Sequence, residues 1–480
     1  MSQIVDDSAA ATAATAEEKS TESTAMSAGD YGPERDPDPP DSDPDSRPVL
    51  PDGPAGVPRI SNLPATPVAG EALIVPPATP PAAERLAPGA PPAAGFVPLC
   101  VPELRGNEWV YVKECLDTNW VSSVGAYVDR FEQAVANRVG AAHAVATVNG
   151  TAALHVALML AGVQRDDEVI VSTLTFIAPA NAIRYVGAHP VFIDAEPDHW
   201  QMDTEKLRDF LENQCLELGG ELRDRVTGRR VSAIVPVHIL GHPVEMGEVL
   251  GLADRYGLKV IEDATESLGA EWRGRPVGQL GDIACFSFNG NKLITTGGGG
   301  MLVTNDAALA RRARYLTTQA KDDPIEYMHS EVGYNYRLTN VLAAMGVAQM
   351  ELLDEYIEQK RSIAARYAEG LGDVPGITLM TEAPWARSVF WMYTVLVDQE
   401  VYGTDSRALL RILAERKIQA RPLWQPLHLS GAHNGESYTE CPVAERLNRD
   451  ALSLPCSVGL TEADQARVIE AIRELAVVRA

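Results

Sequence analysis

The chain has 480 residues, a formal net charge of −25 at pH 7 and six cysteines. This length is enough for a large two-part fold, and the acidic balance argues against nucleic acids and anionic membrane surfaces as partners. The scattered cysteines include no Cys-x-x-Cys pair, which indicates free thiols in a reducing compartment and neither a disulfide framework nor a metal site. The N-terminus lacks a signal pattern and no apolar run is long enough to cross a bilayer, so we expect a cytoplasmic protein.

Residues 1–95 differ in composition from the rest of the chain. Residues 1–96 contain 18 of the 33 prolines, with 15 acidic and 5 basic residues. The segment lacks apolar periodicity, so it cannot bury enough surface to offset the entropy cost of ordering. The composition predicts a disordered tail that serves as a passive leader, with a docking segment for a partner as the alternative.

Apolar strands and helices alternate after residue 96. The pattern predicts strands at residues 144–148, 168–172, 190–194, 233–237, 258–262, 283–288 and 301–304. Helices are predicted at residues 106–118, 127–138, 151–161, 178–186, 203–216, 244–256, 307–318 and 338–371. This alternation predicts an α/β fold with a mostly parallel sheet in a large domain, residues 96–350, whose ligands bind at the carboxyl ends of the strands.

A smaller C-terminal α/β domain is expected at residues 351–480. Its predicted strands are residues 377–380 and 392–397, and its predicted helices are residues 406–415 and 462–478.

The stretch from Gly281 to Met301 carries the clearest chemical signal. An apolar strand is followed by Lys292 in a polar turn and then by four glycines, 297–300. A desolvated lysine favours the neutral amine, which is the form that makes a Schiff base. The alternative is an ordinary surface lysine in a hairpin.

Other motifs follow other predicted strands. Gly150 and Thr151 begin a helix whose amides suit a phosphate, although Thr151 is also a plain capping residue. Asp263 ends a strand, where a buried carboxylate needs a cation such as a protonated pyridine nitrogen, or is a helix cap. Phe176 could stack on a flat ring or belong to the core.

Together these motifs resemble fold-type-I pyridoxal-phosphate enzymes, and more narrowly the DegT/DnrJ/EryC1/StrS family of sugar aminotransferases. The resemblance covers residues 96–480. It implies that Lys292 forms the Schiff base with pyridoxal 5′-phosphate and that Asp263 pairs with the ring nitrogen. It also implies a homodimer, because Asn335 would reach the phosphate of the neighbouring subunit's cofactor. The remaining cofactor-site residues that it implies are Gly150, Thr151, Phe176, Glu266 and Ser287.

Glu266 departs from the family pattern, which often has Gln or His at this position. A carboxylate near the phenolic oxygen of the cofactor would need a proton or another cation, which leaves the role of Glu266 open.

Several loops resemble the branch that aminates a UDP-4-keto-6-deoxy-N-acetylhexosamine for surface-glycan or nonulosonic-acid biosynthesis. The expected reaction converts the C4 ketone of a nucleotide sugar to an amine, with L-glutamate as donor. A sugar dehydratase of the same family is one alternative, but those relatives carry His at the Lys292 position. A non-catalytic regulatory or sensory protein is the other alternative. Candidate substrate residues are Trp120, Ser122, His238, His329, Arg337 and His428.

Overall fold

The computed structural model describes residues 95–323 and 325–477. The predicted tail, residues 1–95, therefore lies outside the described residues except for Gly95. The described residues belong to a single compact unit, so the boundary expected at residue 350 stays a prediction. No helix in these two ranges is long and apolar enough to span a bilayer.

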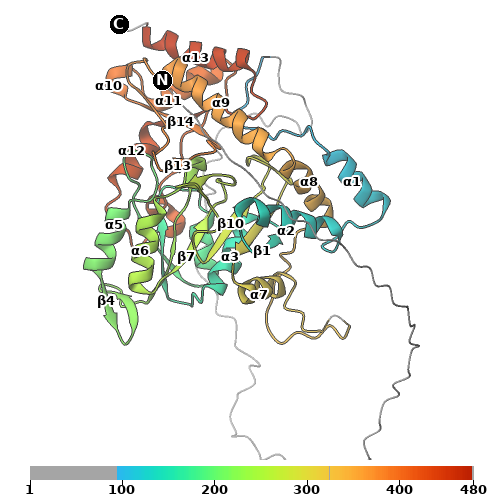
Figure 1. The fold of residues 1–480 in the computed structure, drawn as a ribbon. Helices are drawn as coiled ribbons and strands as arrows, with labels where there is room; N and C mark the ends of the chain where they lie inside the picture. Colours follow the sequence, from blue (N-terminus) through green and yellow to red (C-terminus); the bar gives the residue numbers. More distant parts are fainter. Residues whose placement is uncertain (1–94, 324, 478–480) are drawn as a thin grey trace, which may run out of the picture. The chain divides into compact units, whose positions relative to one another are not determined.

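A central sheet organises the first part of the described chain. In these residues it has seven strands in the order β1-β11-β10-β7-β6-β2-β3 (Figure 1). Strand β11 is antiparallel to both of its neighbours, and the other pairs in the sheet are parallel. The mostly parallel sheet predicted from the sequence is thus confirmed. The strand bounds are β1 His143–Thr147, β2 Glu168–Ser172, β3 His189–Ile193, β6 Val231–Val235, β7 Lys259–Asp263, β10 Ile283–Ser287 and β11 Gly300–Thr304.

The strands are largely apolar, and both faces of the sheet are covered. In β2, Val169 and Val171 belong to one hydrophobic cluster, whereas Ile170 belongs to a second. Successive side chains of a strand point to opposite faces, so the two clusters lie on the two sides of the sheet. Helices α2 Ala126–Val139, α3 Gly150–Leu160, α4 Ala178–Tyr185 and α7 Ala307–Thr317 contribute to the first cluster, and α5 Thr204–Asp209 and α6 Met246–Tyr256 contribute to the second.

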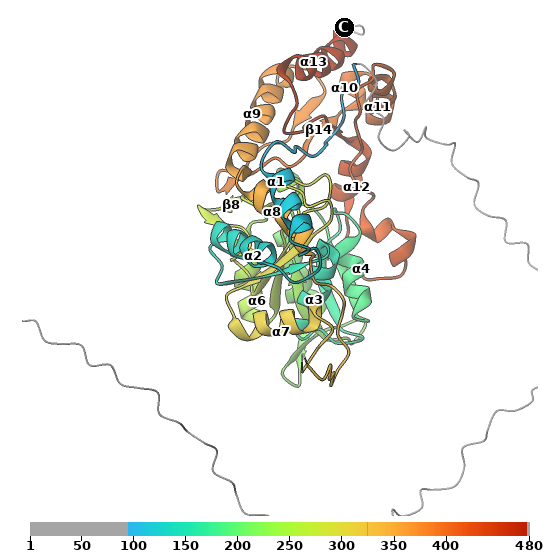
Figure 2. The ribbon, with the colours of Figure 1, turned by 90° about the vertical axis from the view of Figure 1, so that its right-hand side faces the viewer.

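The second part of the chain contains a smaller antiparallel sheet of β12 Ile377–Leu379, β14 Tyr393–Val397 and β15 Ala451–Leu454. Figures 1 and 2 both show α9, α13 and β14 at one end of the described region and α3, α6 and α7 at the other. The helices of this part are α9 Leu353–Leu371, α10 Gln399–Tyr402, α11 Ser406–Glu415, α12 Pro442–Asp450 and α13 Glu462–Val477.

The helix predicted at residues 338–371 is two helices. Helix α8, Asn340–Met350, packs against α1, Glu108–Asp117, and against α2, while α9 contacts α13 and β12. The interruption at residues 351–352 lets each helix pack against different partners.

The described residues also contain short 3-10 helices at Ile239–Gly241, Leu427–Leu429 and Gly431–His433.

The helix predicted at residues 203–216 is also wrong in its second half. Helix α5 ends at Asp209, a π-helical turn follows over Phe210–Gln214, and β4, Cys215–Leu218, pairs antiparallel with β5, Glu221–Asp224. Gly219 and Gly220 both have positive φ, 65° and 83°, as a tight hairpin turn requires. A further small sheet joins β8 Glu271–Trp272, β9 Arg275–Pro276 and β13 Ala386–Arg387.

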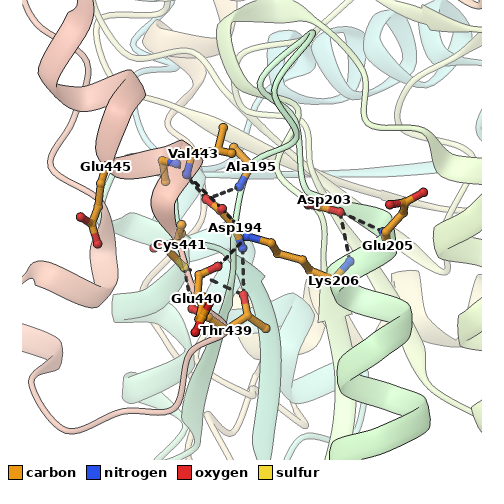
Figure 3. Close-up of polar contacts among 12 residues, drawn as sticks. Asp194, Ala195, Asp203, Glu205, Lys206, Thr439, Glu440, Cys441, Val443 and Glu445 are labelled. Atoms are coloured by element: carbon orange, nitrogen blue, oxygen red, sulfur yellow. Dashed lines mark hydrogen bonds and ion pairs between the residues drawn. The ribbon is translucent and has the colours of Figure 1, made fainter.

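Asp194 joins the edge of the large sheet to α12 (Figure 3). Its buried carboxylate accepts hydrogen bonds from Ala444 N–H at 2.8 Å and Val443 N–H at 3.2 Å, in the first turn of α12. Lys206 Nζ donates to the same carboxylate at 2.6 Å. A negative charge at a helix N-terminus is stabilised by the free amides there. Asp194 therefore attaches the helix that precedes β15 to the end of β3.

Candidate active site

A cavity of about 620 Å³ opens at the carboxyl ends of β7 and β10, beside the N-terminus of α3. This volume is typical of a small-molecule site. Seven of the predicted cofactor-site residues lie on its wall: Gly150, Thr151, Phe176, Asp263, Glu266, Ser287 and Lys292. Strand ends far apart in the sequence thus meet where a parallel sheet is expected to bind its ligand.

Lys292 lies in the loop that follows β10. Its N–H donates to Asn289 O at 3.0 Å, which forms the predicted tight turn. Its side chain is 14% exposed, and Nζ donates to Glu266 Oε1 at 3.3 Å. Nζ also lies 4.2 Å from the ring centroid of Trp391, within cation–π range. The amine is therefore largely desolvated but still faces the cavity.

Close packing of glycine brings the phosphate turn beside this loop. A methyl group on Gly300, the first residue of β11, would lie 2.4 Å from the backbone carbonyl group of Asn149. Asn149 caps α3, with its side chain accepting from Ala152 N–H at 2.8 Å. Only a residue without Cβ lets the strand approach the helix start this closely.

The N-terminus of α3 fits an anion. A Cβ on Gly150 would meet Ser287 Cβ at 3.0 Å and Thr265 Cγ2 at 3.1 Å, so a glycine lets the helix start pack closely against these two residues. The hydroxyls of Thr151 and Ser287 lie on the same wall as the positive end of the helix dipole. This set of donors suits a phosphate group.

Asp263 is the last residue of β7 and is 2% exposed. Its Oδ1 accepts from Thr265 N–H at 3.1 Å. Burial raises the pKa of Asp263, while the contacts to Thr265 and the charge of Lys292 act in the opposite direction. A cation in the cavity would compensate this desolvated carboxylate, and a protonated ring nitrogen fits that need.

Glu266 is a second buried carboxyl group on the wall. Burial raises its pKa, and the charge of Lys292 and a hydrogen bond from Leu240 N–H at 2.8 Å lower it. Leu240 adopts φ 60°, an unusual backbone conformation for leucine, and directs its N–H to Glu266. The sequence left open what would compensate a carboxylate at position 266. The ammonium of Lys292 and the N–H of Leu240 supply part of that compensation.

The DegT/DnrJ/EryC1/StrS aminotransferase family matches residues 102–473. This chain belongs to that family. GDP-perosamine synthase of Caulobacter vibrioides is 41% identical over 382 residues, 79% of this chain and 98% of the relative. GDP-perosamine synthase of Escherichia coli O157:H7 is 37% identical over 379 residues, 79% of this chain and 98% of the relative.

The crystal structure of S. venezuelae DesV in complex with a ketimine intermediate has a TM-score of 0.71 and 32% identity, covering 79% of this chain and 98% of DesV. The protein is a pyridoxal-phosphate-dependent sugar aminotransferase, so the predicted fold-type-I class, cofactor and enzyme class are confirmed.

Four predicted site residues of the aminotransferase lie at the surface, away from the cavity wall. The side chains of Trp120, Ser122, His329 and Asn335 are exposed. The His329 Nδ1 atom lies 2.8 Å from Gln319 O, and Asn335 forms a β-bridge with Thr318. The structure describes a single subunit, so their contacts with a neighbouring subunit or substrate stay predictions.

Three other candidates are engaged inside the aminotransferase fold. Arg337 pairs with the buried carboxylate of Glu132. The ring of His238 accepts from Val244 N–H at 3.0 Å on Nδ1, which leaves Nε2 to donate to Glu262 at 3.2 Å.

The third, His428, has Nδ1 2.8 Å from the hydroxyl of Thr173 and Nε2 3.3 Å from Glu445. All three have structural partners and are absent from the wall of the cavity, so their proposed substrate contacts have no support from its geometry.

Sequence reasoning missed Trp391 and Trp424, which also line the cavity of the aminotransferase. Trp391 also donates from its indole N–H to Asn291 O at 2.8 Å, next to Lys292. Both come from the second part of the chain, about 100 residues or more beyond Lys292, and no local motif marks them.

Proposed function

We propose that this aminotransferase converts the C4 ketone of a nucleotide-linked 4-keto-6-deoxy sugar to the amine, with L-glutamate as the amino donor. The observation that carries the proposal is the convergence of Lys292, Asp263 and the N-terminus of α3 on one cavity. The aromatic side chains of Phe176, Trp391 and Trp424 on the same wall suit a flat ring and a sugar.

Each group has a distinct task. Pyridoxal phosphate, when bound, supplies an electron sink for the carbanion formed at the amino-acid carbon. Gly150, Thr151 and Ser287 would hold its phosphate, and Asp263 would keep the proton on the ring nitrogen. Lys292 Nζ, at the cavity wall, would attach the cofactor and then take and return the proton at the reacting carbon.

Phe176 is the residue to which we assign the stacking role. It lies on the cavity wall and is 56% exposed, so one face of its ring is not covered by the rest of the subunit. A cofactor ring between Phe176 and the strand ends would cover that face.

Two nucleotides are candidates for the sugar carrier. The loops around Trp120 and residues 317–324 favour a UDP-linked N-acetylhexosamine, as in the branch that they resemble. The relatives named GDP-perosamine synthase favour a GDP-linked sugar. A direct test offers UDP- and GDP-4-keto-6-deoxy sugars with glutamate to the purified protein and identifies the product by mass spectrometry.

The same assay separates the alternatives. A sugar dehydratase would release a deoxygenated keto sugar that carries no new amino group, and the presence of Lys292 disfavours it. A regulatory protein would convert neither the UDP-linked nor the GDP-linked keto sugar. Formation of an amino sugar together with 2-oxoglutarate supports the proposal, and a cofactor-loaded protein that forms no amine from either nucleotide sugar contradicts it.

The active form is proposed to be a homodimer. The exposed positions of Asn335, Trp120 and Ser122 are compatible with a role in a neighbouring subunit's site. Sedimentation of the holoenzyme tests this proposal.

A further inference from the structure

A pair of cysteines and a buried lysine form a cluster directly behind the Lys292 loop. Cys100 precedes α1, Cys456 follows β15, and Lys360 lies in α9. A backbone hydrogen bond from Cys456 N–H to Leu99 O, 2.7 Å, holds the two cysteine segments side by side. All six cysteines of the chain lie in the described residues, and Cys100 is the one that is not fully buried.

Lys360 places a positive charge in this cluster. Its side chain is almost completely enclosed, with 1% of the residue exposed. The ammonium donates to Trp391 O at 2.7 Å and to Cys456 O, and it lies 3.7 Å from Cys100 Sγ. Two carbonyls and one sulfur thus match the three donors of an ammonium group. Burial disfavours its charge, but the attraction of the Cys100 and Cys456 thiols outweighs that cost and raises the pKa of Lys360.

We propose that Cys100 is a thiolate that peroxides oxidise, and that Cys456 is the thiol that resolves the oxidised form as a disulfide. Cys100 is partly exposed, the Lys360 ammonium lies 3.7 Å from its sulfur, and the backbone hydrogen bond to Leu99 O brings the Cys456 segment beside it. Reactive cysteines occupy partly exposed, electropositive sites of this kind, often next to a resolving cysteine.

The electrostatics of the pair support this division of roles. The neighbouring Cys456 thiol, together with the charges of Lys360 and the more distant Lys292, lowers the pKa of Cys100 to about 6 against the effect of burial. The proximity of Cys100 and complete burial raise the pKa of Cys456. Cys100 is therefore the nucleophile and Cys456 keeps its proton at pH 7.

The chemistry balances with hydrogen peroxide as the oxidant. The Cys100 thiolate attacks one oxygen, the O–O bond breaks, and the departing hydroxide takes a proton to become water. Cys456 then loses its proton and attacks the sulfur of the Cys100 sulfenic acid, whose S–O bond breaks to release a second water. Two thiols lose two electrons, and one peroxide is reduced to two waters.

Oxidation at this position would reach the active-site loop. Cys100 Sγ lies 3.5 Å from Asn291 O, which also accepts the indole N–H of Trp391. Asn291 directly precedes Lys292. A disulfide would draw the Cys100 sulfur toward Cys456 and alter this contact, so we expect the oxidised enzyme to lose turnover.

The first test measures alkylation of each cysteine in the untreated holoenzyme against pH, using iodoacetamide and peptide mass spectrometry. The readout is the pH midpoint and not the rate, because a thiolate becomes less nucleophilic as its pKa falls. We expect a midpoint near 6 for Cys100, compared with about 8.5 for an ordinary thiol. The other five cysteines are buried and should react little in the folded enzyme. A Cys100 midpoint near that of an ordinary thiol overturns the proposal.

The second test treats the holoenzyme with one equivalent of hydrogen peroxide and maps the products without reduction. We expect a peptide linking Cys100 to Cys456 in the parent protein. A dimedone adduct at Cys100 should accumulate in Cys456→Ser, and neither product should form in Cys100→Ser. Oxidation confined to other residues, or an adduct on Cys456 in Cys100→Ser, overturns the proposal.

The coupling to Lys292 is tested by turnover, and this part alone rests on the proposed function. Peroxide should inactivate the parent enzyme, dithiothreitol should restore it, and Cys100→Ser should keep its turnover under both treatments. Full turnover by protein whose disulfide has been verified overturns the coupling. Failure of the proposed function would appear separately, as an untreated holoenzyme that forms no amino sugar.

Discussion

Two enclosed lysines, one in the Lys292 loop and one in the cluster behind it, meet opposite environments. Lys292 faces a cavity of about 620 Å³ and pairs with the carboxylate of Glu266. Lys360 meets two carbonyl oxygens and a cysteine sulfur, and it is absent from the cavity wall. Trp391 connects the two regions, since its ring lies over Lys292 and its carbonyl accepts from Lys360.

The comparison shows that burial of a lysine does not by itself make a catalytic group. An amine can react with a ligand only where a cavity admits the ligand, and Lys292 lines such a cavity. Where the protein fills the surroundings, as at Lys360, the same amine instead satisfies carbonyl groups and influences its neighbours electrostatically. Changes at the two sites should therefore separate activity from stability.

The largest effect is expected from Lys292→Ala. The change removes the amine that would bind the cofactor and move the proton, so turnover should fall by about 10²- to 10⁴-fold or more. Cofactor held through Gly150, Thr151 and Ser287 should keep the variant folded. Steady-state assay with circular dichroism as the folding control checks this, and near-normal turnover by folded protein would refute the mechanism.

Lys360→Met should act on stability. The substitution keeps a similar volume but leaves the carbonyls of Trp391 and Cys456 without their donor, at a cost of roughly 3 kcal/mol in unfolding free energy. Denaturant unfolding measures the loss. The control for charge is the exposed Lys113→Met, which removes only a surface ion pair with Asp117 and should change the unfolding free energy by less than about 1 kcal/mol. An unchanged unfolding midpoint in Lys360→Met would show that the ammonium is not needed there.

Asp263→Asn should slow turnover on the order of 10²-fold, because a neutral amide cannot keep the ring nitrogen protonated. The amine of Lys292 is untouched, so the absorbance band of the lysine-bound cofactor should persist. Single-turnover absorbance with glutamate follows the proton-transfer step. Normal rates would mean that another residue pairs with the ring nitrogen, and Glu266 on the same wall would be the first to examine.

Asn335→Ala should weaken cofactor retention by about 10-fold, the value of one hydrogen bond to a charged phosphate. The side chain is exposed in the subunit, so its loss should not alter unfolding. Equilibrium dialysis of pyridoxal phosphate measures the affinity. Unchanged affinity in a verified dimer would remove Asn335 from the partner's site.

The smallest effect is expected from deletion of residues 1–95. The segment lacks apolar periodicity, and the motifs of the site lie beyond it. The shortened protein should keep its turnover and should still sediment as a dimer. A marked loss of dimer or activity would show that the tail contributes to the folded enzyme.

The sequence by itself determined much of the site. Lys292, Asp263, Ser287 and the start of α3 each follow an apolar strand, and parallel strands bring their carboxyl ends to one edge of the sheet. Strand and helix periods are local properties, so the order of elements and the residues that line this cavity could be predicted from the sequence.

Only the tertiary structure decided which polar residues turn inward to one another. Arg337 pairs with Glu132, His238 with Glu262, and Asp194 with the first turn of α12, over separations that no local pattern encodes. Trp391 and Trp424 reach the cavity, and Cys100 meets Lys360, for the same reason. Such contacts arise from the close packing of distant segments, in which each buried polar group must find its partner wherever the fold places one.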